Sequence, residues 1–395
     1  MFTITDKKIK KKRTIRIVLH CIIYGFALFG LASISTYLLV KYNLTNETGI
    51  VDQNSRIYQQ NVPFHVDENE KNVMTLTSIN NQLEQLTKIR SHMIEEYCRV
   101  KVVNAFAGSN AQAMIDEYMV HRSGTVLDNM LLAVDLRLGK NQEYIRQKKS
   151  CVQTNEMIRT DIASYVGLSN NSNNVFPWGN DEIWETLKKA IMKDENVILQ
   201  AAQQVDIDPR MLLAVMFVEQ NRVYRTEREF VKSVLLPFSL LSTGSNASLG
   251  TMNIKPQTAQ EIEKNLTDPT SQYYPGDAYT HLLDFSTDNP DRERIKRLTD
   301  YKNRYYSYLY GALYIKEYEQ QWKRAGMPIT GRPEIIGTLF NIGFKHSLPN
   351  ASPKVGGSKI DIKGVHYTFG SLAYEFYYSG ILAQEFPMLP YNDKK

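Results

Sequence analysis

The stretch that constrains the fold most runs from Asp208 to Gln220 and reads DPRMLLAVMFVEQ. Asp208 can cap the free N–H groups of a helix, and Pro209 suits the first helical position, so the two predict a helix start. Residues 211–218 are apolar on every side of that helix, which indicates that it is buried. This segment therefore predicts the core of a mainly α-helical domain.

Glu219 ends this apolar run. Apolar walls disfavour a charged carboxylate, and so does the negative end of the helix dipole, so both effects are expected to raise its pKa. A carboxyl group that keeps its proton near neutral pH can act as a general acid, which glycoside cleavage requires. The simpler alternative is that Glu219 is the first solvated residue after a core helix.

A boundary precedes this domain at residues 169–174, which read SNNSNN and are followed by Pro177-Trp178-Gly179. This composition resists both helix and strand. Beyond it the hydrophobic periodicity predicts helices without sustained strand alternation. The predicted helices cover about 181–204, 209–220, 256–265, 301–324, 332–343 and 369–380. Glu375, in the last of them, has no expected role.

Three further segments carry a resemblance to a known family. Residues 247–259 read ASLGTMNIKPQTA and resemble the signature of the soluble lytic transglycosylase family: Ser, Gly-Leu-Met-Gln, Ile-x-Pro and Thr-Ala. Glu219 precedes this run, as the catalytic Glu of that family does. GALYI at 311–315 resembles the family's Gly-Ala-x-Tyr-Leu, and LFNIG at 339–343 resembles its Ala-Tyr-Asn-x-Gly. The resemblance covers about residues 181–345.

The resemblance implies a lysozyme-like domain at 175–395 that cleaves the MurNAc–GlcNAc β-1,4 bond of peptidoglycan without a cofactor. Glu219 would protonate the leaving oxygen and then help the C6 hydroxyl of the substrate attack C1, giving a 1,6-anhydro product. By themselves, Met252 could be core filler and Asn341 a helix cap. The positions that would contact glycan by their match to the motifs are Met252, Asn253, Tyr314, Phe340 and Asn341.

The chain also departs from the family pattern. Gln220 stands where the family commonly has Ser, Asn253 where it usually has Gln, and Phe340 where it usually has Tyr. The separation of 34 positions from Glu219 to Asn253 implies an insertion near 222–246. These departures favour the alternative of a catalytically weak module that binds glycan or scaffolds an envelope-spanning assembly.

The insertion leaves the reaction type open. Glu227 and Glu229 lie in it, and either could act as a second carboxylate and permit direct hydrolysis, although a pair of exposed charges is the simpler interpretation.

The N-terminus predicts a membrane anchor. Residues 1–16 form a basic tail, and residues 17–40 carry no formal charge and exceed the length needed to cross a hydrocarbon core of about 30 Å. The basic flank places the tail in the cytoplasm and the rest of the chain outside it. A cleaved signal peptide is the alternative, but its apolar part is usually only about 7 to 15 residues long. We expect an uncleaved single-pass anchor in the cytoplasmic (inner) membrane, with the catalytic domain in the periplasm or extracytoplasmic space.

Residues 41–170 are expected to form a linker, up to about residue 66, and then a helical extracytoplasmic region that acts as a spacer or docks envelope machinery. Cys98 and Cys151 are the only exported cysteines, and an oxidising compartment permits a disulfide between them, with two free thiols as the alternative. The scattered His residues do not indicate a metal site.

Composition narrows the class of partner. With 43% hydrophobic and 23% charged residues, the 395-residue chain is an ordinary globular sequence. Its net charge is +5, but the first 16 residues carry seven basic side chains against Asp6, so the remainder is close to neutral. Without a basic cluster in its body, the chain is not expected to bind nucleic acid.

Overall fold

The computed structural model describes Tyr24 and residues 93–121, 124–154, 174–225 and 248–388. The predicted anchor at 17–40 apart from Tyr24, the linker, and residues 226–246 of the insertion, which include Glu227 and Glu229, lie outside these residues. No helix in the described part of the chain is long and apolar enough to cross a membrane.

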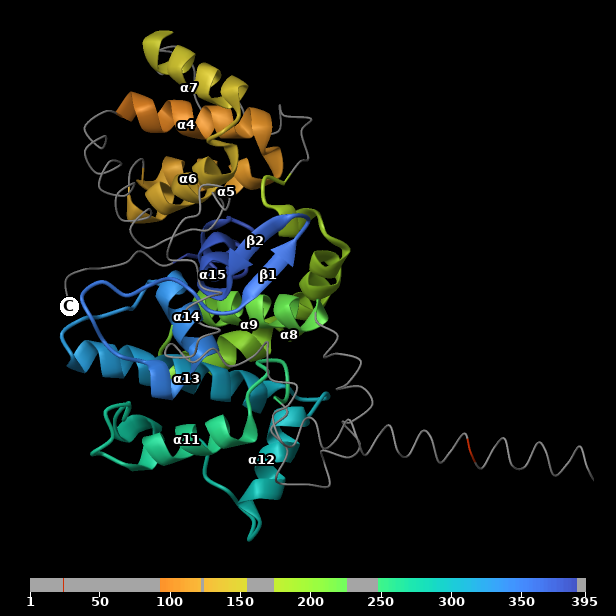
Figure 1. Cartoon of the computed structure of the whole chain (residues 1–395), viewed down its shortest axis with the longest axis vertical. Coiled ribbons are helices and arrows are strands. Elements are labelled where there is room, and N and C mark those ends of the chain that lie inside the picture. The colour runs from red at the N-terminus through yellow and green to blue at the C-terminus, as the bar shows by residue number, and fades with distance from the viewer. Residues whose placement is uncertain (1–23, 25–92, 122–123, 155–173, 226–247, 389–395) are drawn as a thin grey trace, which may run out of the picture. The chain divides into compact units, whose positions relative to one another are not determined.

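The described chain is mainly helical, as predicted (Figure 1). Before residue 155 the helices are α4 (Met93–Phe106), α5 (Gly108–His121), α6 (Thr125–Leu138) and α7 (Gln142–Thr154). From residue 174 the elements are η4 (Pro177–Asn180), α8 (Glu182–Val205), α9 (Pro209–Tyr224), α11 (Pro256–Thr267), η5 (Asp277–Tyr279), α12 (Pro290–Thr299), α13 (Tyr305–Arg324), α14 (Pro333–Ile342), η6 (Phe344–His346), β1 (Lys359–Ile362), β2 (Val365–Thr368) and α15 (Phe369–Tyr378). The six helices predicted after residue 175 are therefore present, with ends shifted by a few residues.

The hairpin of β1 and β2 was not predicted. Its strands are antiparallel, and Lys359 pairs with Thr368 while Ile362 pairs with Val365. Lys363 and Gly364 join them with φ of 50° and 78°, the positive values that a tight two-residue hairpin turn requires. Each strand has only four residues, which is too short for alternation to stand out in the sequence.

Helix α12 was also missed, because its sequence PDRERIKRLT is mostly charged. The side chain of Asn289 caps it by accepting a hydrogen bond from the Arg292 backbone N–H at 3.0 Å. Ile295 and Leu298 are buried, three residues apart on one face. The Asn-Pro start was the available signal for this helix.

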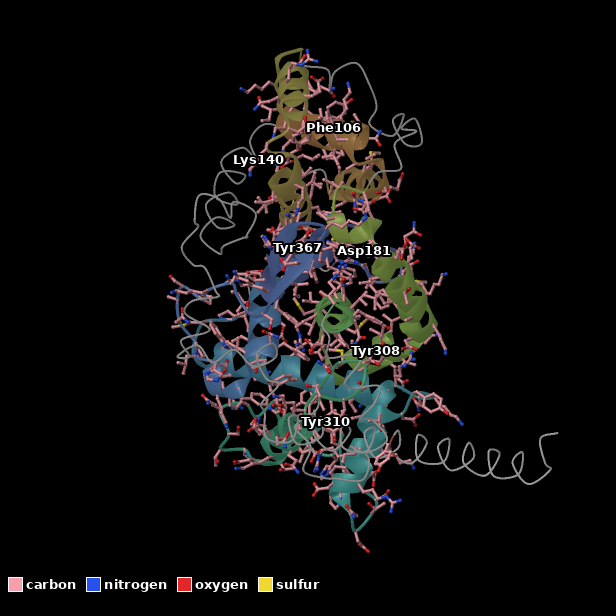
Figure 2. All side chains as sticks on the ribbon, turned by 45° about the vertical axis from the view of Figure 1, so that its right-hand side comes forward. Phe106, Lys140, Asp181, Tyr308, Tyr310 and Tyr367 are labelled. Carbon is pink, nitrogen blue, oxygen red and sulfur yellow. A yellow bond between two sulfur atoms is a disulfide. The ribbon has the colours of Figure 1, made fainter. Side chains whose placement is uncertain are left out.

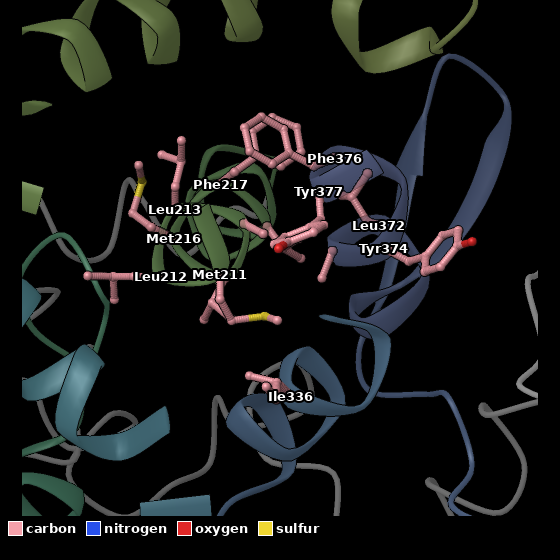
Figure 3. Packing of buried hydrophobic residues seen from close by; sticks show 14 of the residues in the cluster. Met211, Leu212, Leu213, Met216, Phe217, Ile336, Leu372, Tyr374, Phe376 and Tyr377 are labelled. Carbon is pink, nitrogen blue, oxygen red and sulfur yellow. The ribbon is translucent and has the colours of Figure 1, made fainter. Parts of the chain in front are cut away.

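Helix α9 forms the core that its sequence predicts. The Asp208 side chain accepts a hydrogen bond from the Arg210 backbone N–H at 2.8 Å, which confirms the expected cap. Helices α8, α13, α14 and α15 pack around α9 (Figure 1). Phe217 of α9 stacks on Phe376 of α15, with ring centroids 4.2 Å apart (Figure 3). Glu219 follows Phe217 by two residues, about half a helical turn, so the packing of α9 fixes where that carboxyl group lies.

Arg210 ties the start of α9 to the chain that follows α15. Its fully buried guanidinium donates hydrogen bonds to four carbonyl oxygens, those of Phe376, Tyr377, Ile381 and Phe386. Burial lowers the pKa of Arg210 to about 10, still high enough to keep the side chain charged at neutral pH.

The helices before residue 155 contact those after residue 174. The Tyr374 hydroxyl of α15 donates to Asn129 Oδ1 of α6 at 2.7 Å. The backbone N–H of Val175 donates to Asn110 Oδ1 of α5 at 2.9 Å. The buried hydrophobic residues of both regions belong to one cluster. The two regions therefore share a core across the segment where the composition changes.

Glu375 lies in this shared core, so the expectation that it has no role was wrong. Its carboxylate is 0% exposed and forms an ion pair with Arg137 of α6. Trp178 Nε1 donates to its Oε1 at 2.9 Å, and the Tyr367 hydroxyl donates to the same oxygen at 2.7 Å. Burial and the nearby Glu375 charge raise the pKa of the Tyr367 phenol, so Tyr367 remains a hydrogen-bond donor.

The structure contains the disulfide between Cys98 of α4 and Cys151 of α7, with Cα atoms 5.6 Å apart. Replacing both cysteines with Ser is expected to lower the free energy of unfolding by up to about 4 kcal/mol, because the bridge closes a loop between residues 53 apart. Chemical denaturation of the two proteins would measure the difference. A Cys21→Ser variant is the control, and equal stability of all three proteins would contradict this prediction.

Candidate functional site

Glu219 is buried near the C-terminal end of α9, at 3% exposed. It is therefore not a solvated residue beyond the core helix, and the simpler interpretation of its position was wrong. Asn253 Nδ2 and Arg222 Nη2 both donate hydrogen bonds to its Oε1. Arg222 Nε donates to Oε2 at 3.3 Å.

Asn253 belongs to the 247–259 run, so the structure brings two of the sequence motifs together at one carboxyl group. The sequence interpretation missed Arg222. The available signal was its spacing, since residues three apart on a helix share a face and can pair.

The loop that carries Asn253 is closed on itself. Leu249 and Ile254 exchange backbone hydrogen bonds of 2.8 and 3.0 Å across it. Gly250 and Asn253 have φ of 71° and 50°, a region that Gly adopts freely and Asn tolerates. A Cβ atom at Gly250 would also collide with the carbonyl oxygen of Leu298. The loop thus has the residues that its backbone needs to hold the Asn253 amide against Glu219.

Gln220 connects this loop to α9. Its Nε2 donates to the backbone oxygen of Thr251. Gln220, which stands where the family commonly has Ser, therefore supports the loop that carries Asn253.

Met252 joins the loop to α13. Its side chain is fully buried against α13, where a Cβ atom on Gly311 would lie 2.7 Å from Met252 Cε and 2.8 Å from Cγ. The backbone N–H of Met252 donates to Ser307 Oγ of α13 at 3.2 Å. The third motif, GALYI, thus packs on the second because Gly311 leaves room for Met252.

Tyr314 and Phe340 form a pair between α13 and α14, with ring centroids 4.9 Å apart. Both are buried, and the Tyr318 hydroxyl donates to the Tyr314 hydroxyl at 2.9 Å. Burial raises the pKa of Tyr314, so its phenol stays neutral. Other tyrosines of α13 point to different neighbours (Figure 2): Tyr308 donates to Asp194 of α8, and Tyr310 donates to Glu263 of α11.

Asn341 holds the chain before the hairpin. Its Oδ1 accepts hydrogen bonds from the backbone N–H of Ser358 at 2.8 Å and from Ser358 Oγ at 3.0 Å. Its buried Nδ2 has no hydrogen-bond partner among the described residues. Of the five positions expected to contact glycan, only Asn253 bonds to Glu219 within the described part of the chain.

The sequence interpretation did not anticipate Glu317, another buried carboxyl group. It lies on α13 three residues after Tyr314, and it accepts a hydrogen bond from Asn265 Nδ2 at 2.9 Å. Burial raises its pKa well above the ordinary value. Among the described residues no hydrogen bond joins it to Glu219.

Comparison of the chain with protein-family models, with curated proteins and with solved structures finds no match. No group of three or more His, Cys, Asp or Glu side chains that could hold a metal ion occurs among the described residues. What the site can do chemically therefore has to be inferred from Glu219 and its partners.

The hydrogen bonds to Glu219 leave one of its oxygens partly open. An ionised carboxylate oxygen can accept two hydrogen bonds. Oε1 receives two, from Asn253 and Arg222, whereas Oε2 receives one. Within the described residues, Oε2 therefore has one acceptor position that no hydrogen bond fills.

Gly311→Ala is expected to impair this site without touching Glu219. The added methyl group would push Met252, and with it Asn253, which should cost about 1–3 kcal/mol of stability and lower any activity of the site. Thermal unfolding and a cleavage assay would measure both effects. Adding Met252→Ala should cost less than the sum of the two single losses, because the shorter side chain leaves room for the added methyl group. Wild-type behaviour of the single variant would show that the contact does not matter.

Proposed function

We propose that the protein is a membrane-anchored peptidoglycan lytic transglycosylase that uses Glu219 as its single acid and base. The hydrogen bond from Asn253 to Glu219 is the observation that carries this proposal. It joins two segments, 34 residues apart, that resemble the family in sequence. The packing of Met252 against Gly311 adds a third segment to the same site.

The proposed reaction uses Glu219 twice. The protonated carboxyl first donates its proton to the glycosidic oxygen, so the bond to C1 of MurNAc breaks and GlcNAc leaves as an alcohol. The resulting carboxylate then accepts the proton of the C6 hydroxyl while O6 bonds to C1. The proton is thereby returned to Glu219, and a 1,6-anhydro end is formed.

One observation favours a second candidate, a catalytically weak module that binds glycan or scaffolds an envelope-spanning assembly. Glu219 forms an ion pair with Arg222, and both side chains are buried. A carboxylate paired in this way is a common structural element, and it does not need to exchange protons with a substrate.

The proposed location follows from the anchor. Residues 17–40 would hold the protein in the cytoplasmic membrane, with the catalytic domain in the periplasm or extracytoplasmic space and peptidoglycan strands as its partner. The disulfide between Cys98 and Cys151 fits an oxidising compartment. Binding of nucleic acid forms no part of the proposal.

Digestion of purified sacculi by the full chain in detergent, followed by mass spectrometry, tests the proposal. Anhydro-MurNAc ends are expected. Reducing ends would instead mean that water attacks, which would point to Glu227 or Glu229 as a second carboxylate. Retention on sacculi without new ends would favour the binding module.

A further inference from the structure

The proposed reaction must break one contact of the site, the ion pair between Arg222 and Glu219. A general acid needs a proton on its carboxyl group, whereas Arg222 is held to Glu219 as a charged partner, with the two side chains only 5% and 4% exposed. Both nitrogens that bond to the carboxyl group, Nε and Nη2, are donors that favour an ionised acceptor. In this arrangement Arg222 contacts both oxygens of the carboxyl group that the proposed reaction needs for its proton transfers.

We propose that Arg222 is a positioning residue that keeps Glu219 in a resting, unprotonated pair, and that cleavage starts when Arg222 moves away. This inference rests on the proposed function. It adds a control step to the same carboxyl group, and it explains how a buried ion pair and an acid catalyst can occupy one position.

The two partners of Glu219 come from different elements. The Arg222 side chain comes from α9 itself, three residues after Glu219, so separating the two charges requires a change of side-chain conformation and no shift between helices. Asn253 comes from the separate 248–254 loop and remains bonded to Oε1. After release, the neutral amide still orients the carboxyl group, and both oxygens have room for a proton.

Among the described residues, few groups besides Arg222 bond to the carboxyl group of Glu219. From α9, Arg222 supplies the charge that bonds to Glu219, and from the 248–254 loop Asn253 supplies an uncharged amide. Within the described residues no other charged side chain bonds to Glu219. Removing the Arg222 charge should therefore alter the pH dependence of cleavage more than any other single change around the site.

The test compares Arg222→Met with Arg222→Lys in the full chain, using sacculi as the substrate and the pH–rate profile as the readout. Met keeps the length of the aliphatic chain and removes the charge, so cleavage at pH 7 should rise at least tenfold. The profile should also move toward higher pH by at least one unit. Lys keeps the charge but cannot reproduce the contact through two nitrogens, so its profile should stay closer to that of wild type than the profile of Arg222→Met does.

Arg225→Met is the matched control. Arg225 caps the same helix but pairs with Asp181 instead of Glu219, so its loss should leave the profile unchanged. Adding Glu219→Gln to Arg222→Met should abolish the gain. The inference is wrong if Arg222→Met cleaves more slowly than wild type with an unmoved profile, since Arg222 would then orient the acid during the reaction.

A second measurement keeps the proposal testable if a variant folds too poorly for the cleavage assay. Unfolding of Glu219→Gln, Arg222→Met and the double variant forms a thermodynamic cycle, and a resting pair predicts that the two single losses do not add. If the two single losses of stability added strictly, Glu219 and Arg222 would not form the proposed resting pair. Failure of the proposed function looks different: neither wild type nor Arg222→Met would then release any glycan product at any pH, and both proposals would fall.

Discussion

Replacing Glu219 with Gln is expected to lower glycan cleavage by about 10² to 10⁴, the usual contribution of a general acid. Gln has the same shape and keeps an oxygen for the Asn253 and Arg222 donors, but it has no proton to give. The fold should persist, because α9 is held by the packing of its apolar residues and by Arg210. The rate of release of soluble glycan fragments from sacculi measures the effect.

Glu185→Gln supplies the matched control for this experiment. Glu185 is an exposed residue on the neighbouring helix α8, so the same chemical change there should leave cleavage unaltered. Circular dichroism of both variants would establish that they are folded. Equal digestion by the Glu219→Gln protein and the wild type would remove Glu219 from the mechanism altogether.

Replacing Glu375 with Ala is expected to lower the free energy of unfolding by about 3–5 kcal/mol, because it leaves Arg137 as an unpaired charge that is largely buried. Trp178 Nε1 and the Tyr367 hydroxyl would lose the same acceptor. Chemical denaturation of the full chain in detergent measures this loss.

Two further variants show where the loss comes from. Glu375→Gln keeps an acceptor oxygen while removing the charge, so its stability should lie between those of wild type and Glu375→Ala. Glu185→Ala removes an exposed carboxylate and should change the stability by less than about 0.5 kcal/mol. If Glu375→Ala were as stable as Glu185→Ala, the buried network would not hold the helices together.

The sequence was most informative where local rules act. The Asp208 cap, the all-round burial of residues 211–218 and the helices after residue 175 depend on neighbours within a turn or two. The motif segments predicted that Asn253 contacts glycan, whereas its hydrogen bond to Glu219 is a finding of the structure.

The rest depended on contacts that a linear pattern does not encode. Met252 is buried because Gly311 lies opposite, 59 positions along the chain, and no periodicity links the two residues. Glu375 looked like one polar residue in an aromatic helix, yet Arg137 and Trp178 meet it from 238 and 197 residues away. The Arg222 pair is local, but a spacing of three residues on a helix does not by itself show whether two side chains pair or point to solvent.

The contacts around Glu375 also determine how this chain could be divided. The composition changes at 169–174, but Arg137, Asn110 and Asn129 on one side are held by Glu375, Val175 and Tyr374 on the other. A cut in the covalent chain there would leave these buried surfaces complementary. Two separately produced fragments should recognise each other and reassemble, which would make this protein a candidate for a split reporter whose signal depends on fragment pairing.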